Sequence, residues 1–277
     1  MSSEQIHIHP TAIVSPTAVI GVGTTVGPYS IIGPHVVMGA GNKIGPHVVI
    51  EGRTKMGDGN TVYQFASVGA APQDLKFRGE PSELHIGNEN IIRECVTLQP
   101  GTEGGGMLTT IGDKNLFMAN THVGHDSRVG SRCVVANGSA LAGHVTLGDG
   151  VIVGGLCGIH QFVRLGDIAM LGAGSMVSHD VPPYCIAQGD RAYLVGLNRV
   201  GLDRNGVSKE EYAVLRDVYR ALFIPNSTNV KGMLFKERLA YARTLVGKSA
   251  KAAALMGFLE KSERGIMTQR EGASEGD

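Results

Sequence analysis

Residues 123–158 read VGHDSR-VGSRCV-VANGSA-LAGHVT-LGDGVI-VGGLCG, six consecutive groups of six residues that each begin with Val or Leu. Side chains repeat every 3.6 residues on a helix face and every two residues on a strand face, so neither element alone produces this period. A period of six is typical of a β-helix, in which each hexad forms a short strand and a corner. The first residue of each hexad then points into a narrow core.

The same aliphatic column extends in both directions from this stretch. It runs from Ile8 to Val177, with interruptions after Val68 and Leu98. Gly often follows the aliphatic residue, which we interpret as relief at the corner, and the fifth position is mostly small. Cys133 and Cys157 lie in that small column, so we expect both thiols to pack in the core.

Composition agrees with this architecture and excludes several classes of protein. The chain has 277 residues with 40 Gly and no Trp, and this Gly content is twice the average usage of about 7%. A hydrophobic content of 42% excludes a disordered chain, and a net charge of +0 gives no footprint for nucleic acid. No signal peptide and no apolar run of membrane-spanning length is visible, so we expect a cytoplasmic protein without a transmembrane segment.

The repeat ends at Pro182-Pro183, which divides the chain into two predicted domains. We expect a β-helix over residues 1–188, with excursion loops near 69–85 and 99–110, and a small α-helical C-terminal domain over 189–277. Ser208-Lys209-Glu210-Glu211 resembles a capping box at the start of a helix. The segment from Asp190 onward holds 15 Lys and Arg against 11 Asp and Glu, so it carries a net charge of +4.

Five histidines lie within residues 122–179. If three hexads complete one coil, residues 18 apart stack about 4.8 Å from each other. Gly143 and then Gln161 follow His125 at this spacing, and His144 follows Asp126. His160 lies two coils beyond Gly124 in the same way. The period therefore gathers His125, Gly143, His144, His160 and Gln161 on one patch.

This patch suits general base catalysis, because the ordinary imidazole pKa of about 6.5 lies near neutral pH. Asp126 is placed to orient His125, and the N–H of Gly143 is placed to stabilise an oxyanion. No Ser or Cys nucleophile is obvious, which favours direct attack by a substrate hydroxyl. Two alternatives are a solvent-facing histidine set without function and a zinc site of the gamma-class carbonic anhydrase type. The spacing of His122, His125 and His144 does not resemble that zinc site, so we expect no metal.

Several motifs together resemble the UDP-N-acetylglucosamine O-acyltransferase family, cytosolic enzymes that begin lipid A synthesis in Gram-negative bacteria. The resemblance covers nearly the whole chain. Its specific pieces are Ile6-His7-Ile8-His9-Pro10-Thr11-Ala12, Pro72-Gln73-Asp74-Leu75-Lys76, His122-Val123-Gly124-His125-Asp126, Ile159-His160-Gln161-Phe162, Asp180-Val181-Pro182-Pro183-Tyr184 with Ala187-Gln188-Gly189, and Gly196-Leu197-Asn198 with Arg204.

The resemblance implies a left-handed parallel β-helix and a homotrimer with active sites between neighbouring chains. It implies transfer of a 3-hydroxyacyl group from acyl carrier protein to the glucosamine 3-position of UDP-N-acetylglucosamine. No cofactor is implied beyond the acyl-phosphopantetheine of the carrier protein. The implied roles are catalysis by His125, Asp126 and Gly143; substrate binding by Asp74, Lys76, His122, His144, His160, Gln161, Asn198 and Arg204; an acyl-chain groove at Met170 and Ala173; and carrier-protein contact at Arg216 and Arg220.

The chain departs from the family pattern at three positions, Arg191, Val200 and Asn205. Many members have His, Glu and a second basic residue there, so these changes bear on nucleotide contacts. They leave open whether the acceptor sugar carries a 3-hydroxyl or a 3-amino group. A coenzyme A-dependent sugar N-acyltransferase and a non-catalytic β-helix also remain open.

Overall fold

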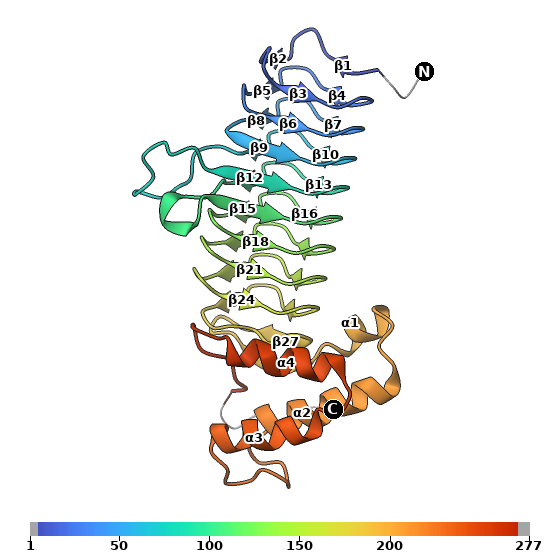
Figure 1. The fold of residues 1–277 in the computed structure, drawn as a ribbon, viewed down its shortest axis with the longest axis vertical. Coiled ribbons are helices and arrows are strands. Elements are labelled where there is room, and N and C mark those ends of the chain that lie inside the picture. Colours follow the sequence, from blue (N-terminus) through green and yellow to red (C-terminus); the bar gives the residue numbers. More distant parts are fainter. Residues whose placement is uncertain (1–4, 271–277) are drawn as a thin grey trace.

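The chain folds as a tall stack of coils with a group of helices at its C-terminal end (Figure 1). The computed structural model describes residues 5–270. Within that range the strands form three sheets that run along the stack, which we name by their first strands. Every strand pair is parallel except the last, so each sheet forms one face of the β-helix.

The β1 sheet has eleven strands. They are β1 (His7–Ile8), β4 (Thr25–Val26), β7 (Lys43–Ile44), β10 (Thr61–Val62), β13 (Ile91–Ile92), β16 (Leu116–Phe117), β19 (Val134–Val135), β22 (Ile152–Val153), β25 (Met170–Leu171), β27 (Cys185–Gln188) and β28 (Tyr193–Leu197).

The β2 sheet has nine strands and the β3 sheet has eight. The β2 sheet contains β2 (Ile13–Val14), β5 (Ile31–Ile32), β8 (Val49–Ile50), β11 (Ser67–Val68), β14 (Thr97–Leu98), β17 (His122–Val123), β20 (Ala140–Leu141), β23 (Gly158–Ile159) and β26 (Met176–Val177). The β3 sheet contains β3 (Val19–Ile20), β6 (Val37–Met38), β9 (Arg53–Met56), β12 (Glu83–Ile86), β15 (Leu108–Ile111), β18 (Arg128–Val129), β21 (Thr146–Leu147) and β24 (Arg164–Leu165).

Strand register confirms the predicted coil length. His122 pairs with Ala140, which pairs with Gly158, so a coil without an excursion loop advances the chain by 18 residues. The hexad aliphatics, such as Val123, Leu141 and Ile159, are buried in the interior of the coils. A fully buried ladder of asparagine side chains supports the core, because the Oδ1 atom of each accepts the N–H of the next; its members are Asn42, Asn60, Asn90 and Asn115.

Both excursion loops are present, but each is shorter than the sequence suggested. The first covers residues 69–82 and the second residues 99–107, and the second contains a 3₁₀ turn at Glu103–Gly105. The difference arises because β12 and β15 are four-residue strands that pair with each other over their full length, and β12 also pairs with β9 over four residues. Both loops project from the same side of the stack (Figure 1).

The glycines after the aliphatic column allow neighbouring coils to stack closely. The prediction that they relieve the backbone at a corner was wrong. A Cβ on Gly27 would lie 2.7 Å from the carbonyl carbon of Gly45 in the next coil. The left-handed backbone of the corner occurs two residues later, at Tyr29 (φ 58°) and His47 (φ 55°). The glycine after the aliphatic residue is therefore needed where backbones meet, whereas the left-handed corner position is occupied by glycine, as at Gly23 and Gly41, or by a larger residue.

A hairpin and four helices follow the β-helix. Strand β27 extends the stack by pairing with β25, and β28 then returns antiparallel, a strand that the sequence analysis did not predict. The helices are α1 (Arg199–Arg204), α2 (Lys209–Phe223), α3 (Phe235–Leu245) and α4 (Ala250–Glu260). Residues 271–277 of the predicted helical domain lie outside the described residues. No helix within residues 5–270 is both long enough and apolar enough to cross a membrane.

Only one of the two hydrogen bonds of the predicted capping box forms at the start of α2. The Ser208 hydroxyl accepts the N–H of Glu211, as expected of an N-cap. The Glu211 carboxylate does not return to Ser208; it accepts the Ser249 hydroxyl and the Lys251 N–H at the start of α4. The carboxylate thus joins two helices of the C-terminal domain.

The C-terminal segment covers the open end of the β-helix, where unpaired strands would otherwise meet solvent. Asp180 is fully buried, and its Oδ2 atom lies 2.8 Å from Nη2 of Arg164. The same carboxylate accepts the Ser262 hydroxyl, and the Asp180 backbone pairs with Ile266. The arginine also donates to the Phe258 carbonyl of α4, so one buried ion pair fixes the last helix to the stack.

We predict that Gly27→Ala lowers the free energy of unfolding by about 1–3 kcal/mol, because the added methyl group would overlap backbone atoms of the next coil. Gly257→Ala in α4 is the matched control, since a Cβ there meets nothing within 4 Å. Thermal unfolding followed by circular dichroism measures both variants. Equal changes in the two variants would contradict the stacking role.

Candidate active site

A groove of about 910 Å³ runs along the C-terminal strands of the β2 sheet. Its floor is formed by the outward-facing residues of four successive strands. These residues are His122, Ala140, Gly158 and Met176. The two central positions carry almost no side chain, which makes the sheet surface hollow there. Gln73 of the first loop and Asp190 and Arg191 beyond β27 complete the lining.

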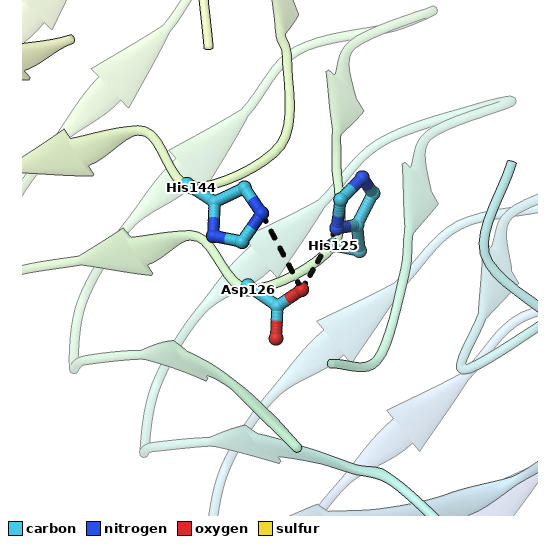
Figure 2. Close-up of side chains that lie close together, drawn as sticks. All are labelled: His125, Asp126 and His144. Carbon is cyan, nitrogen blue, oxygen red and sulfur yellow. Dashed lines mark hydrogen bonds and ion pairs between the residues drawn. The ribbon is translucent and has the colours of Figure 1, made fainter. Parts of the chain in front are cut away.

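A chain of hydrogen bonds lies at one wall of this groove. Nδ1 of His125 is 2.8 Å from Oδ2 of Asp126 (Figure 2). The Asp126 side chain is fully buried, while that of His125 is 11% exposed and lines the groove. Thr102 of the second loop donates its N–H to Oδ1 of Asp126 at 2.9 Å and its hydroxyl to Oδ2 at 2.6 Å. These bonds fix the carboxylate, which in turn fixes the imidazole ring.

The glycine run of the second loop explains how the loop reaches the carboxylate. Gly105 packs directly on Asp126, and a Cβ at this position would lie 1.9 Å from Cγ of Asp126. The adjacent Gly104 faces open space, with nothing within 4 Å of such a Cβ. The loop can therefore cover Asp126 only because residue 105 has no side chain.

Gly143 lies beside the His125 ring, as the 18-residue stacking predicts. A Cβ on Gly143 would lie 2.5 Å from Nε2 of His125, so only glycine leaves space for the ring. Within residues 5–270 no carbonyl accepts the Gly143 N–H. This N–H is therefore free to donate to a bound molecule.

His144 packs behind His125 and Asp126, away from the groove. Its Nε2 atom lies 3.9 Å from Oδ2 of Asp126 (Figure 2). The ring packs edge-on against His125 at 5.1 Å and stacks on Phe162 at 4.3 Å between centroids. Burial lowers the pKa of His144, although the nearby Asp126 carboxylate opposes this effect. The ring is therefore neutral near pH 7.

Burial also lowers the pKa of His122, and the neighbouring His125 lowers it further. The Nδ1 atom of His122 is 2.7 Å from the Thr97 hydroxyl in the coil before it. A neutral, hydrogen-bonded ring thus stands at the start of the groove floor. It can present a donor or an acceptor to a substrate without adding charge.

His125, Asp126 and His144 offer three atoms within 4.8 Å of one another, which is close enough to hold a metal ion. The hydrogen bonds disfavour this use of the cluster. Both carboxylate oxygens already accept from Thr102, and Oδ2 also faces Nδ1 of His125. A metal on Asp126 would have to displace these donors, so the residues present fit a proton-transfer site better than the zinc site considered above.

The structure brings five of the predicted site residues together in the groove. These are His122, His125, Gly143, His160 and Gln161. Asp126 and His144 lie behind the wall. Within the part of the chain that the structure describes, the other predicted residues do not line the groove; these are Asp74, Lys76, Met170, Ala173, Asn198, Arg204, Arg216 and Arg220.

Each of these other residues has a defined place in the chain. The Asp74 carboxylate accepts the Lys76 N–H within the first loop. Asn198 is a buried N-cap of α1 that donates to the Ile168 carbonyl, and Arg204 is exposed at the end of that helix. Met170 lies on β25 of the β1 sheet, with Ala173 in the turn beyond it. Arg216 and Arg220 are exposed on α2, where Arg216 pairs with Asp217 at 3.3 Å.

Sequence reasoning missed several groove residues, and it missed Thr102. The missed lining residues include Gln73, Gln99, Met176, His179 and Asp190, while Arg191, named above for its bearing on nucleotide contacts, also lines the groove. Met176 and His179 could have been found by continuing the 18-residue spacing from Gly158 and Gln161. Thr102 lies in an excursion loop, where the period gives no information on position.

A His–Asp pair facing a hollow on a hexapeptide β-helix is typical of acyl-transferring enzymes. Residues 108–143 match the model of bacterial transferase hexapeptides, and residues 180–267 match the model described as UDP-N-acetylglucosamine O-acyltransferase, domain 2. A relative from Myxococcus xanthus named acyl-[acyl-carrier-protein]--UDP-N-acetylglucosamine O-acyltransferase is 52% identical over 94% of this chain and 98% of its own length.

Further relatives agree. A protein of the same name from Paracoccus denitrificans is 56% identical over 58% of this chain and 62% of its own length. The solved structure of LpxA from Acinetobacter baumannii matches with a TM-score of 0.88 and 44% identity, covering 94% of this chain and 99% of that one. The chain belongs to the UDP-N-acetylglucosamine O-acyltransferase family. These matches confirm the predicted left-handed β-helix with a C-terminal helical domain.

We predict that Gly105→Ala detaches the second loop from Asp126, because its methyl group would overlap the carboxylate. Hydrogen exchange of the peptide over residues 99–107 should become about ten- to 100-fold faster, as expected for loss of hydrogen bonds to a charged group. Gly104→Ala is the matched control and should leave the exchange rate unchanged. Equal exchange rates in the wild-type chain and Gly105→Ala would show that the loop is not held in this way.

Proposed function

We propose that the chain transfers a 3-hydroxyacyl group from acyl carrier protein to the 3-hydroxyl of the glucosamine of UDP-N-acetylglucosamine, in the cytoplasm, as the first step of lipid A synthesis. Family membership and the names of the relatives support this proposal. The observation that carries it is the hydrogen-bonded series of Thr102, Asp126 and His125 at the wall of the groove.

His125 is the general base in this proposal. Its Nδ1 is occupied by Asp126, while its Nε2 has no hydrogen-bond partner among residues 5–270. Nε2 takes the proton of the sugar hydroxyl as the hydroxyl oxygen attacks the thioester carbonyl. Asp126 stabilises the imidazolium that forms, because a buried carboxylate beside it favours the charged ring.

Gly143 supplies the oxyanion contact. Gly143 packs against the His125 ring, and no carbonyl among residues 5–270 accepts its N–H. A bound thioester carbonyl can therefore accept this N–H while the attacking hydroxyl meets the base. When the tetrahedral intermediate collapses, the carbon–sulfur bond breaks and the new ester remains on the sugar. The proton held by His125 then passes to the leaving thiolate of phosphopantetheine.

The cysteines favour direct transfer over a covalent acyl-enzyme. Burial raises the pKa of Cys133 to about 11, and it also raises the pKa values of Cys157 and Cys185. These thiols stay protonated in the core and cannot act as nucleophiles at neutral pH. Cys95 is exposed, but it does not line the groove.

We further propose that the chain acts as a homotrimer. Five successive strands of the β1 sheet present outward apolar residues: Ile91, Leu116, Val134, Ile152 and Met170. The equivalent positions of the β3 sheet carry polar and charged side chains, among them Lys55, Arg128 and Arg164. An apolar stripe of this kind is typical of a subunit interface.

In such a trimer the stripe of one chain would cover the groove of the next. Met170 and Ala173 would then form the far wall of the acyl-chain groove, although they lie outside it in a single chain. The exposed Arg216 and Arg220 are the proposed contacts for the acidic carrier protein. Asp74, Lys76, Asn198 and Arg204 stay candidates for the nucleotide sugar. Sedimentation at three chain masses is the expected result, and a monomer that remains fully active would contradict this arrangement.

We predict that His125→Ala lowers turnover by about 10²–10⁴-fold, the usual cost of removing a general base. Asp126→Asn should also lower turnover, because it favours the wrong ring tautomer. His35→Ala is the matched control, since this exposed histidine lies on an early coil. Release of thiol from 3-hydroxyacyl carrier protein in the presence of UDP-N-acetylglucosamine measures the rate.

Near wild-type turnover in His125→Ala would contradict the mechanism. Efficient turnover with short acyl-coenzyme A, together with none from acyl carrier protein, would favour the sugar N-acyltransferase alternative. A trimeric His125→Ala variant with an unchanged circular dichroism spectrum would show that the loss is chemical and not structural.

A further inference from the structure

Arg264, in the segment after α4, reaches a residue of the groove. Nη2 of Arg264 lies 3.1 Å from Nδ1 of His160 and 3.2 Å from the Ser178 carbonyl oxygen. The two partners come from neighbouring coils, and His160 and Ser178 both line the groove. The mechanism above gives Arg264 no role.

The chemistry of the two groups fixes their roles in this contact. A guanidinium group is always protonated and can only donate. Nδ1 of His160 must therefore be the acceptor, which places the ring proton on Nε2. The carbonyl oxygen of Gln161 lies 3.2 Å from the same Nδ1 and requires the opposite tautomer, with a proton on Nδ1. Arg264 and Gln161 thus favour different forms of His160.

The segment that carries Arg264 is held firmly against the end of the stack. Its neighbour Ile266 pairs with the Asp180 backbone, and Ser262 bonds to the buried Asp180 carboxylate. Gly265 has φ of +81°, and a Cβ there would lie 3.3 Å from the ring of His179, another groove residue. Arg264 is half-buried, and its Nε atom is buried, so the base of the guanidinium is covered by protein while Nη2 reaches the groove.

We propose that Arg264 is a positioning residue that holds His160 as the Nε2–H tautomer. His160 then presents a hydrogen-bond donor to the groove and binds an oxygen that can only accept, such as a carbonyl or phosphate oxygen of a substrate. Without Arg264 the ring would turn its Nδ1 proton to Gln161 and offer an acceptor in place of the donor. The substrate contact rests on the proposed function, whereas the tautomer does not.

Nitrogen-15 spectra of ¹⁵N-histidine-labelled full-length chain test the tautomer without any substrate. His160→Gln assigns the signals by their loss. In the wild-type chain Nδ1 of His160 should show an unprotonated shift and Nε2 a protonated one. In Arg264→Met the two shifts should exchange. A protonated Nδ1 in the wild-type chain, or an unchanged pair of shifts in Arg264→Met, would overturn the proposal.

Kinetics test the consequence for binding. Arg264→Met should lower kcat/KM by about tenfold, the usual scale for losing a group that orients a site residue. A rise in KM for acyl carrier protein would place the acceptor oxygen on the donor substrate, and a rise for UDP-N-acetylglucosamine would place it on the sugar nucleotide. Arg264→Lys should recover part of the loss, because an ammonium group also only donates.

Two controls separate positioning from a general structural effect. Lys261→Met removes an exposed cation of the same segment and should leave both the spectra and the rates unchanged. In a His160→Ala background, Arg264→Met should have little further effect, since the arginine acts through this ring. A full additional tenfold loss in that background would contradict the proposal. Wild-type chain that is inactive but shows the expected tautomer would reject the proposed function alone.

Discussion

Close stacking of 18-residue coils is the constraint on which the rest of the structure depends. Adjacent strands in a sheet lie about 4.8 Å apart, so every corner must fit against the corner of the next coil. Gly27 and Gly143 both occupy positions where a Cβ would overlap the neighbouring coil. At Gly27 the neighbour is backbone, and at Gly143 it is the His125 ring. The same packing rule therefore builds the scaffold in one place and the proposed oxyanion contact in another.

The candidate site combines the rigid stack of coils with two segments that lie outside the stack. The coils fix His125 beside Gly143 and hollow the groove floor at Ala140 and Gly158. The second loop brings Thr102 to the buried Asp126 carboxylate, and the C-terminal segment brings Arg264 to His160. Neither addition carries the proposed reacting atoms. Thr102 acts through Asp126 on His125, the proposed base, which requires a defined tautomer. Arg264 contacts His160, the proposed donor to a substrate oxygen.

The sequence predicts the coils well because their period is strict. One residue number fixes a position on a face, and adding 18 gives the residue stacked beside it, which is how Gly143 was assigned to His125. The period fails where the chain leaves the lattice. It could not place Thr102 or Arg264, because loop and tail conformations depend on contacts between segments distant in sequence. It also could not predict β28, whose pairing with β27 depends on tertiary context.

The sequence indicated which residues have a structural role more readily than it indicated what that role is. The glycines that follow the aliphatic column were recognised from the sequence, but they are needed for contact between coils and not for backbone conformation. Glu211 was expected to cap its own helix, and it instead joins α2 to α4. In both cases the deciding partner lies outside the local sequence.

The most direct test of acyl transfer at this site is the identity of the product. Purified chain would be incubated with carrier proteins that hold 3-hydroxyacyl chains of graded length, and with either UDP-N-acetylglucosamine or its 3-amino analogue. Mass spectrometry would identify the products. The proposed function predicts a UDP-sugar heavier by one 3-hydroxyacyl group, attached as an ester that mild base removes. A product formed only with the amino sugar, or no acylated sugar at all, would contradict it.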